Sequence, residues 1–166
     1  MLVDGAVHVQ YLQRVGMRTD YFVADRARAL TLVEWGPEGT DLPMLLMKWV
    51  EPWVLGSMLW GIIEELPAPE GSLPFDLDEH NAGGEVLMAG DDEGSFGVVQ
   101  IADDFVRALA TLPDERISAV AERWATAEEW IGPWEPNELD PTVEGLRDLA
   151  RQVSGPEQHM YMWWWM

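Results

Sequence analysis

The spacing of apolar residues along the chain predicts both strands and helices. Residues 6–15 alternate in part and carry valine and tyrosine, which is typical of a strand with one buried face. Residues 84–90 and 95–102 flank the sequence Asp-Asp-Glu and predict a β-hairpin with an acidic tip. Residues 43–50 are apolar almost throughout, a pattern that buried strands and buried helices share, and we favour a strand.

Helical spacing or helix boundary signals predict helices in a second set of segments, at residues 25–35, 53–66, 102–112, 115–132 and 141–153. Pro52 suits the first turn of the second helix, whose apolar residues lie on all sides, so we expect a central buried helix there. Asp114 and Asp140 are predicted as the N-caps of the last two helices.

The chain ends in an aromatic run that predicts a final strand at residues 158–165. Successive side chains of a strand point to opposite faces, so Tyr161, Trp163 and Trp165 would share one face. Met160, Met162 and Trp164 would share the other face. We expect this strand to close the sheet and to be buried on both sides. The alternative is an exposed aromatic patch that binds a partner, since tryptophan is enriched at binding hot spots.

These elements predict an α+β fold in a single domain over residues 1–166. A mostly antiparallel sheet of four to five strands would be covered by about five helices. A chain of 166 residues can bury a sizeable core without disulfides or metal. Residues 67–82 contain three prolines and no periodicity, so they predict the longest loop.

The charge balance is strongly acidic. Lysine and arginine number 10 against 30 aspartate and glutamate residues, a formal net charge of -20. Such a surface repels nucleic acid and anionic lipid, and it attracts basic proteins. The alternative is that the charge serves solubility alone. The absence of cysteine excludes disulfides, thiolate zinc sites and a cysteine nucleophile.

The sequence predicts a cytoplasmic protein, because the N-terminus has no basic region followed by an apolar stretch. Residues 44–63 are apolar enough to raise the question of a membrane span. Lys48, Glu51 and Pro52 interrupt this stretch, and the remainder is too short to cross a bilayer.

No pattern of catalytic or metal-binding residues stands out. His8, His80 and His159 are far apart, residues 76–80 match no known metal loop, and residues 90–94 suit a hairpin turn. The glycine-rich phosphate loops and the serine nucleophile motif do not occur. We therefore predict no catalytic residue, no cofactor site and no metal site.

One acidic pattern suggests a surface for partner binding. Glu115, Glu122 and Glu129 are spaced seven residues apart and would form a stripe on the helix predicted at residues 115–132. Their predicted neighbours are an acidic residue and two aromatic anchors, Glu128, Trp130 and Trp134. The alternative is a solvated helix face with tryptophans in the core.

Residues 114–166 resemble a group of small acidic actinobacterial proteins that are uncharacterised. The resemblance rests on ERWATAEEW, VEGLRDLARQV and the terminal MYMWWWM, with RTDYFVAD near residue 20. Those proteins carry cysteine near the terminal Tyr and Trp, whereas this chain has methionine, so no cysteine-based role is carried over. By analogy with other small acidic domains, the resemblance implies an immunity-type or inhibitor role.

Three functions remain open at this point. The first is a non-enzymatic acidic protein that binds a basic partner such as a nuclease or a nucleic-acid-binding factor, of which a DNA mimic is the sharper form. The second is a small hydrolase or ligand-binding domain whose pocket is covered by residues 67–82 and lined by Trp49, Trp53 and Trp60. The third is a structural protein that homo-oligomerises through the tryptophan-rich tail.

Overall fold

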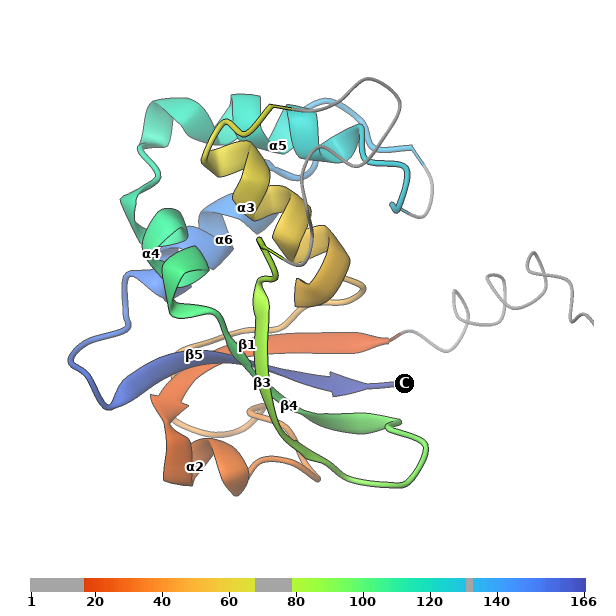
Figure 1. The fold of residues 1–166 in the computed structure, drawn as a ribbon, viewed down its shortest axis with the longest axis vertical. Helices are drawn as coiled ribbons and strands as arrows, with labels where there is room; N and C mark the ends of the chain where they lie inside the picture. Colours follow the sequence, from red (N-terminus) through yellow and green to blue (C-terminus); the bar gives the residue numbers. More distant parts are fainter. Residues whose placement is uncertain (1–16, 68–78, 131–132) are drawn as a thin grey trace, which may run out of the picture.

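The computed structural model describes residues 17–67, 79–130 and 133–166. Its strands form one antiparallel sheet in the order β2-β1-β5-β4-β3 (Figure 1). The strands are β1 (Arg18–Asp25), β2 (Met44–Leu45), β3 (Gly83–Ala89), β4 (Phe96–Ile101) and β5 (Gln158–Trp165). This arrangement confirms the α+β class and the predicted antiparallel sheet.

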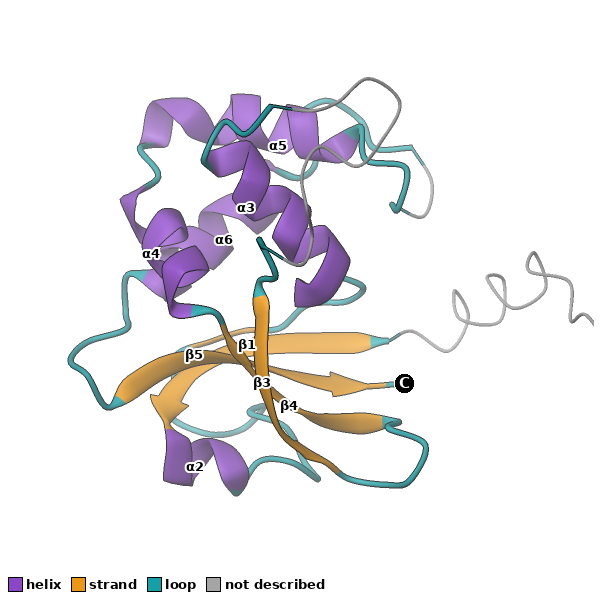
Figure 2. Ribbon diagram, in the orientation of Figure 1, coloured by secondary structure: helices purple, strands orange, loops and turns teal. Residues whose placement is uncertain are grey.

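The helices divide unequally between the two faces of the sheet. They are α2 (Arg26–Leu30), α3 (Ser57–Ile63), α4 (Asp103–Thr111), α5 (Ile117–Ala125) and α6 (Asp140–Ala150). A π-helical turn, Pro52–Gly56, leads into α3, and a 3-10 turn, Asp114–Arg116, leads into α5. Figure 2 shows α3 to α6 on one face and α2 alone on the other. Each segment predicted as a helix contains one, and α3 is buried along its whole length, as expected.

The C-terminal strand β5 lies in the middle of the sheet, between β1 and β4. Met160, Met162 and Trp164 pack into the large core under α3 to α6. Tyr161 and Trp163 pack into the smaller core on the α2 side. The prediction of a strand buried on both faces is therefore confirmed. The exposed part of the tail is limited to its end, where Trp165 is 44% exposed and Met166 is 49% exposed.

The smaller core depends on a tight turn after α2. Gly36 adopts a φ of 70°, and a Cβ atom at this position would come within 2.9 Å of the Trp163 ring. Only glycine fits both the backbone conformation and the close approach. The Trp163 indole then donates a hydrogen bond of 2.8 Å to the carbonyl of Val33, which joins β5 to the segment after α2.

Sequence analysis missed β1. The predicted strand at residues 6–15 lies outside the described residues, whereas Arg18–Asp25 pairs with β5 along its whole length. Residues Thr19 to Ala24 are all buried, so this strand has no alternation of polar and apolar positions. The segment 43–50 was predicted as a strand, and only Met44–Leu45 forms one.

Two details of the predicted helices are wrong. Asp114 does not cap a helix: it begins the 3-10 turn and forms an ion pair with Arg147. Asp140 is the first residue of α6 and not its N-cap, and its carboxylate accepts a hydrogen bond of 2.5 Å from the Ser118 hydroxyl. The hairpin of β3 and β4 is confirmed, and Asp91 stabilises its tip by accepting a hydrogen bond from the Ser95 N–H.

The helix predicted over residues 115–132 ends at Ala125. The carbonyl of Trp124 accepts hydrogen bonds from the Ala127 N–H at 3.1 Å and from the indole of Trp130 at 2.8 Å. A side chain thus satisfies one of the carbonyls that a helix end leaves without a partner. The chain leaves the helix at this point, and the segment that carries Trp130 folds back onto it.

Candidate binding pocket

The segment after β2 is held by buried polar side chains of β1. The Asp20 carboxylate accepts a hydrogen bond of 3.1 Å from the Met47 N–H, and the Thr19 hydroxyl accepts one of 3.1 Å from the Val50 N–H. Both Thr19 and Asp20 are fully buried. Burial raises the pKa of Asp20, while the Met47 N–H and Arg18 lower it. These two side chains add to the backbone hydrogen bonds that continue past β2, from the Thr19 N–H to the Met47 carbonyl at 3.1 Å and from the Trp49 N–H to the Met17 carbonyl at 3.2 Å.

This anchoring forces an unusual backbone conformation on Trp49. Its φ is 71°, in the left-handed region that bulky residues rarely adopt. Such a conformation costs on the order of 1–3 kcal/mol and persists only where surrounding contacts impose it. Here the Trp49 N–H donates to the Met17 carbonyl at 3.2 Å, and its neighbours on both sides are tied to β1. The backbone that carries Lys48 and Trp49 is therefore anchored to β1.

A series of tryptophans forms the opposite wall. Trp124 is fully buried and donates from its indole to the Leu55 carbonyl at 3.0 Å. Trp130 packs edge-on against it at 4.7 Å, and Trp134 packs edge-on against Trp130 at 5.2 Å. Trp130 is only 9% exposed, so it supports the outer ring of Trp134. The indole N–H of Trp134 is buried and has no acceptor among the described residues.

Between these two walls lies a pocket of about 400 Å³. Its lining is mainly aromatic and aliphatic, and consists of Leu46, Met47, Lys48, Trp49, Val50, Trp130, Trp134, Leu139 and Thr142. Pockets of this size bind small molecules or single side chains of a partner. Sequence analysis singled out Trp49, Trp130 and Trp134 in separate hypotheses, and the fold brings them together. It missed Lys48, although this residue is the only lysine in the chain.

The pockets of the described residues do not bring Trp49, Trp53 and Trp60 together, and residues 68–78 of the predicted cover lie outside the described part of the chain. Trp53 is partly buried and packs edge-on against Trp164 at 5.7 Å, at the edge of the large core. Trp60 lines a shallow hollow of about 480 Å³ with Glu64 and His80, apart from the residues around Trp49.

The hollow at Trp60 contains a carboxylate–histidine pair. Glu64 accepts hydrogen bonds from the Trp60 indole at 2.9 Å and contacts His80 Nε2 at 3.1 Å. A histidine oriented by a carboxylate can act as a general base when a nucleophile is within reach. Among the described lining residues, Thr111 carries the hydroxyl, and this group donates to the Arg107 carbonyl at 2.9 Å. The Thr111 hydroxyl is therefore bonded to the backbone and is not activated by the carboxylate–histidine pair.

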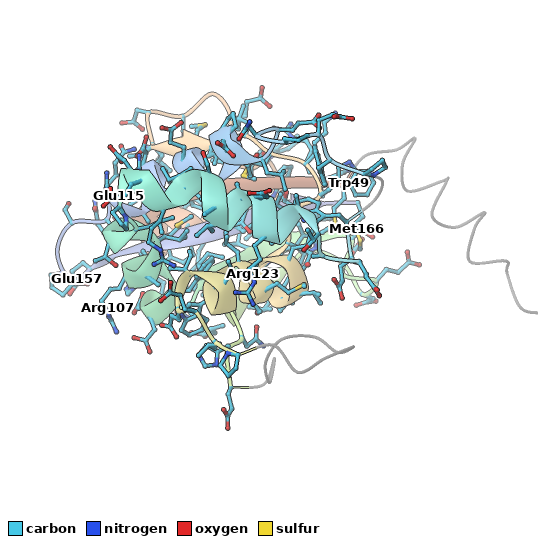
Figure 3. All side chains as sticks on the ribbon, turned by 90° about the horizontal axis from the view of Figure 1, so that it is seen from above. Trp49, Arg107, Glu115, Arg123, Glu157 and Met166 are labelled. Atoms are coloured by element: carbon cyan, nitrogen blue, oxygen red, sulfur yellow. The ribbon has the colours of Figure 1, made fainter. Side chains whose placement is uncertain are left out.

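The predicted acidic residues are exposed but do not form one stripe. Glu115, Glu122, Glu128 and Glu129 are all exposed, and none has an ion pair among the described residues. Glu115 lies in the 3-10 turn and Glu129 follows the end of α5, so the continuous helical ridge is wrong. Figure 3 places Glu115 and Trp49 toward opposite ends of α5. Only Glu128 and Glu129 are close in sequence to the pocket residue Trp130.

The other candidate chemistry gives no further site among the described residues. His159 contacts Asp103 at 3.0 Å, while His8 and residues 76–78 lie outside the described part of the chain. The described residues contain no group of three or more His, Asp or Glu side chains that could hold a metal ion. No helix in the described ranges has the length and apolar character needed to cross a membrane.

Comparisons with protein-family models, with curated proteins and with solved structures give no match to this chain. The interpretation of the pocket therefore rests on its own geometry. The resemblance of residues 114–166 to actinobacterial proteins stays a prediction.

Proposed function

We propose that this chain is a non-enzymatic binding protein of the immunity or inhibitor type, which engages a basic protein partner in the cytoplasm. The observation that supports the proposal is a set of exposed carboxylates that have no ion pair within the described part of the chain, Glu115, Glu122, Glu128 and Glu129, on a chain of net charge -20. The negative charge of such a carboxylate is not neutralised within the fold, so it can attract an approaching basic protein. Complementary charge of this kind raises association rates and sets specificity.

A nuclease or another nucleic-acid-binding factor suits these carboxylates, because its own binding surface is basic. Trp134 would act as the aromatic anchor, since it packs against Trp130, the residue that follows Glu128 and Glu129 in the chain. Trp130 would act indirectly by supporting the Trp134 ring, with which it packs at 5.2 Å. Binding energy at interfaces concentrates in such supported aromatic residues, while rim charges mainly change the association rate. A DNA mimic, in which the carboxylates imitate phosphate groups, is a special form of the same proposal.

The proposal is tested by capturing partners from a lysate of the source cells and measuring their association with the purified protein. We expect a basic protein to be retained, with an association rate that falls as salt rises. The double substitution Glu128→Gln and Glu129→Gln should slow association about threefold or more, because rim charges act mainly on the rate.

The matched control is Asp92→Asn with Glu93→Gln at the exposed hairpin tip, which changes the net charge by the same amount. A smaller effect of this control supports a local surface at Glu128 and Glu129. Equal slowing by both pairs would contradict that surface. Retention of no basic protein at low salt would contradict the proposed function.

The pocket itself favours a second candidate function, a ligand-binding domain. The supporting observation is an aromatic pocket of about 400 Å³ with an anchored wall at Lys48 and Trp49. This function requires no protein partner, and the chemistry of its ligand can be derived from the lining.

A further inference from the structure

The lining of the Trp49 pocket has a different charge from the rest of the protein. The chain carries 30 acidic residues, yet none of the described residues that line this pocket is a carboxylate. The lining instead contains Lys48, the only lysine. Lys48 forms no ion pair among the described residues, whereas Arg18, Arg26 and Arg147 each do. Lys48 also borders a neighbouring hollow that contains Asp20 and Glu38, but both of these carboxylates pair with Arg18.

The polar side chains among the described lining residues can donate hydrogen bonds, and none of them is negatively charged. Lys48 carries an ammonium group, Thr142 carries a hydroxyl, and the tryptophans carry indole N–H groups. The Trp130 indole is already bonded to the Trp124 carbonyl, while the buried indole N–H of Trp134 has no acceptor among the described residues. A ligand that supplies acceptor oxygens matches this set, whereas a cation would face Lys48 with no carboxylate in the lining.

The walls specify the body of the ligand. Indole rings and aliphatic side chains offer flat apolar surfaces on which an aromatic ring can pack face to face or edge-on. A volume of about 400 Å³ holds a molecule of one or two fused rings. Thr19 and Asp20 fix the backbone of one wall before any ligand arrives, so little ordering is required on binding.

We infer that this pocket binds a small organic anion with an aromatic body, whose carboxylate pairs with the Lys48 ammonium while its ring packs between Trp49 and Trp134. This inference goes beyond the proposed function and does not depend on a protein partner. An alternative occupant is a cationic side chain of a partner held by cation–π contacts. The position of Lys48 favours the anion.

The inference is tested with three probes of one shape that differ in charge. These are 1-naphthylacetate, its neutral amide and the cation 2-(1-naphthyl)ethylammonium. Binding to the full chain at pH 7 is measured by calorimetry, and the tryptophan indole N–H signals are followed by NMR. We expect the acid to bind about tenfold more tightly than the amide, because a charge-assisted hydrogen bond is stronger than a neutral one. The indole signals of Trp49 and Trp134 should shift, while that of the core residue Trp124 should not.

The substitution Lys48→Met then removes the positive charge and leaves an unbranched apolar side chain of similar length. We expect the affinity for the acid to fall about tenfold, to the level of the amide, while amide binding is unchanged. The matched control is Arg123→Met, since Arg123 is exposed, forms no ion pair among the described residues and does not line the pocket. This control makes the same change in net charge and should leave the affinity for the acid as it is.

Several outcomes would overturn the inference. Equal binding of acid and amide to the unaltered protein would show that Lys48 does not select an anion, and this result needs no variant. Equal losses in Lys48→Met and Arg123→Met would assign the effect to net charge. Tighter binding of the ammonium probe would assign the pocket to a cation. Failure to capture a basic protein would leave the inference intact, so the two proposals fail separately.

Discussion

The tryptophans of β5 and those of the pocket wall differ in the hydrogen bonds that their indole N–H groups make. Trp163 and Trp164 lie in the central strand, and their indoles donate to the carbonyls of Val33 and Gly94 at 2.8 and 2.9 Å. In the wall, Trp124 and Trp130 are bonded in the same way. Trp134, the outermost ring, has a buried N–H without an acceptor among the described residues. The indole N–H groups of Trp163 and Trp164 thus both have acceptors within the fold. The series in the pocket wall ends in Trp134, whose N–H has none among the described residues.

The difference indicates which aromatic residues serve stability and which are available for binding. A buried polar group is normally paired, and one left unpaired carries a free-energy cost of about 1–3 kcal/mol. Proteins retain such groups at sites where function requires them more often than in an ordinary core. Trp163 and Trp164 of the C-terminal strand are bonded within the fold, whereas Trp134 lines the pocket for which we propose a binding role.

Removing β5 should have the largest effect on the stability of the fold. A chain that stops after Glu157 loses the strand that pairs with both β1 and β4, and both cores lose their central residues. We expect no cooperative unfolding transition by circular dichroism and collapsed amide dispersion by NMR. Deletion of Met166 alone is the control, because this residue is 49% exposed. A folded truncated chain would show that β5 is not needed for the sheet.

A matched pair of tryptophan substitutions tests the comparison directly. Trp163→Phe removes a buried donor from the Val33 carbonyl and leaves a cavity, so we expect a loss of about 2–3 kcal/mol in the free energy of unfolding. Trp134→Phe removes a buried N–H that has no described acceptor, which is favourable, and part of the ring that packs on Trp130, which is unfavourable, so its net effect should stay within about 0.5 kcal/mol. Urea denaturation measures both. Equal losses would mean that Trp134 contributes as much to the stability of the fold as Trp163.

The close contact between β4 and the β5 tryptophans gives a third test. A Cβ atom on Gly97 would lie 2.6 Å from the Met88 carbonyl oxygen and would also overlap the Trp164 ring. Because one obstacle is backbone, we expect Gly97→Ala to cost about 1–3 kcal/mol in unfolding free energy. Gly145→Ala on α6 is the control, since the new Cβ would meet only the end of the Leu45 side chain, at 3.1 Å. Its change should be smaller or favourable, and equal losses would contradict the tight packing at Trp164.

The elements with a clear period could be predicted from the sequence. The alternation in residues 158–165 separates the two faces of β5 correctly, because each face packs against its own core. The helices were also found, since their apolar spacing or boundary residues are local signals. Their ends were not, because the end of α5 depends on the Trp130 indole reaching back to the Trp124 carbonyl.

The pocket could not be predicted, because its geometry comes from residues far apart in sequence. Thr19 and Asp20 hold the segment 46–50 through contacts that span about thirty residues, and burial on both faces removed the signal for their strand. Trp49 was considered apart from Trp130 and Trp134 for the same reason. Lys48 did have a signal, since a single lysine among thirty acidic residues in an aromatic segment is unusual.

A pair of tyrosines extends the comparison to the smallest effects. Tyr21 and Tyr161 are both almost fully buried, on opposite faces of the sheet. The Tyr21 hydroxyl donates to the Val50 carbonyl at 2.9 Å, whereas the Tyr161 hydroxyl has no partner among the described residues. Tyr21→Phe should therefore lower the free energy of unfolding by about 1–2 kcal/mol at pH 7, and Tyr161→Phe should leave it unchanged or raise it slightly.

Alkaline pH should destabilise the fold through both hydroxyls, whatever their hydrogen bonding. Burial raises the pKa of Tyr21 well above its usual value, with Glu51 adding to the shift, and burial also raises the pKa of Tyr161. The unfolded chain loses its phenol protons near pH 10, while the folded chain retains them, so this stability is present below about pH 10 and is lost as pH rises. Each Phe variant should show a shallower loss of stability between about pH 9 and 11, measured by urea denaturation. Equal destabilisation of both variants at pH 7 would contradict the difference in hydrogen bonding, because Tyr161 would then have a partner as strong as Val50.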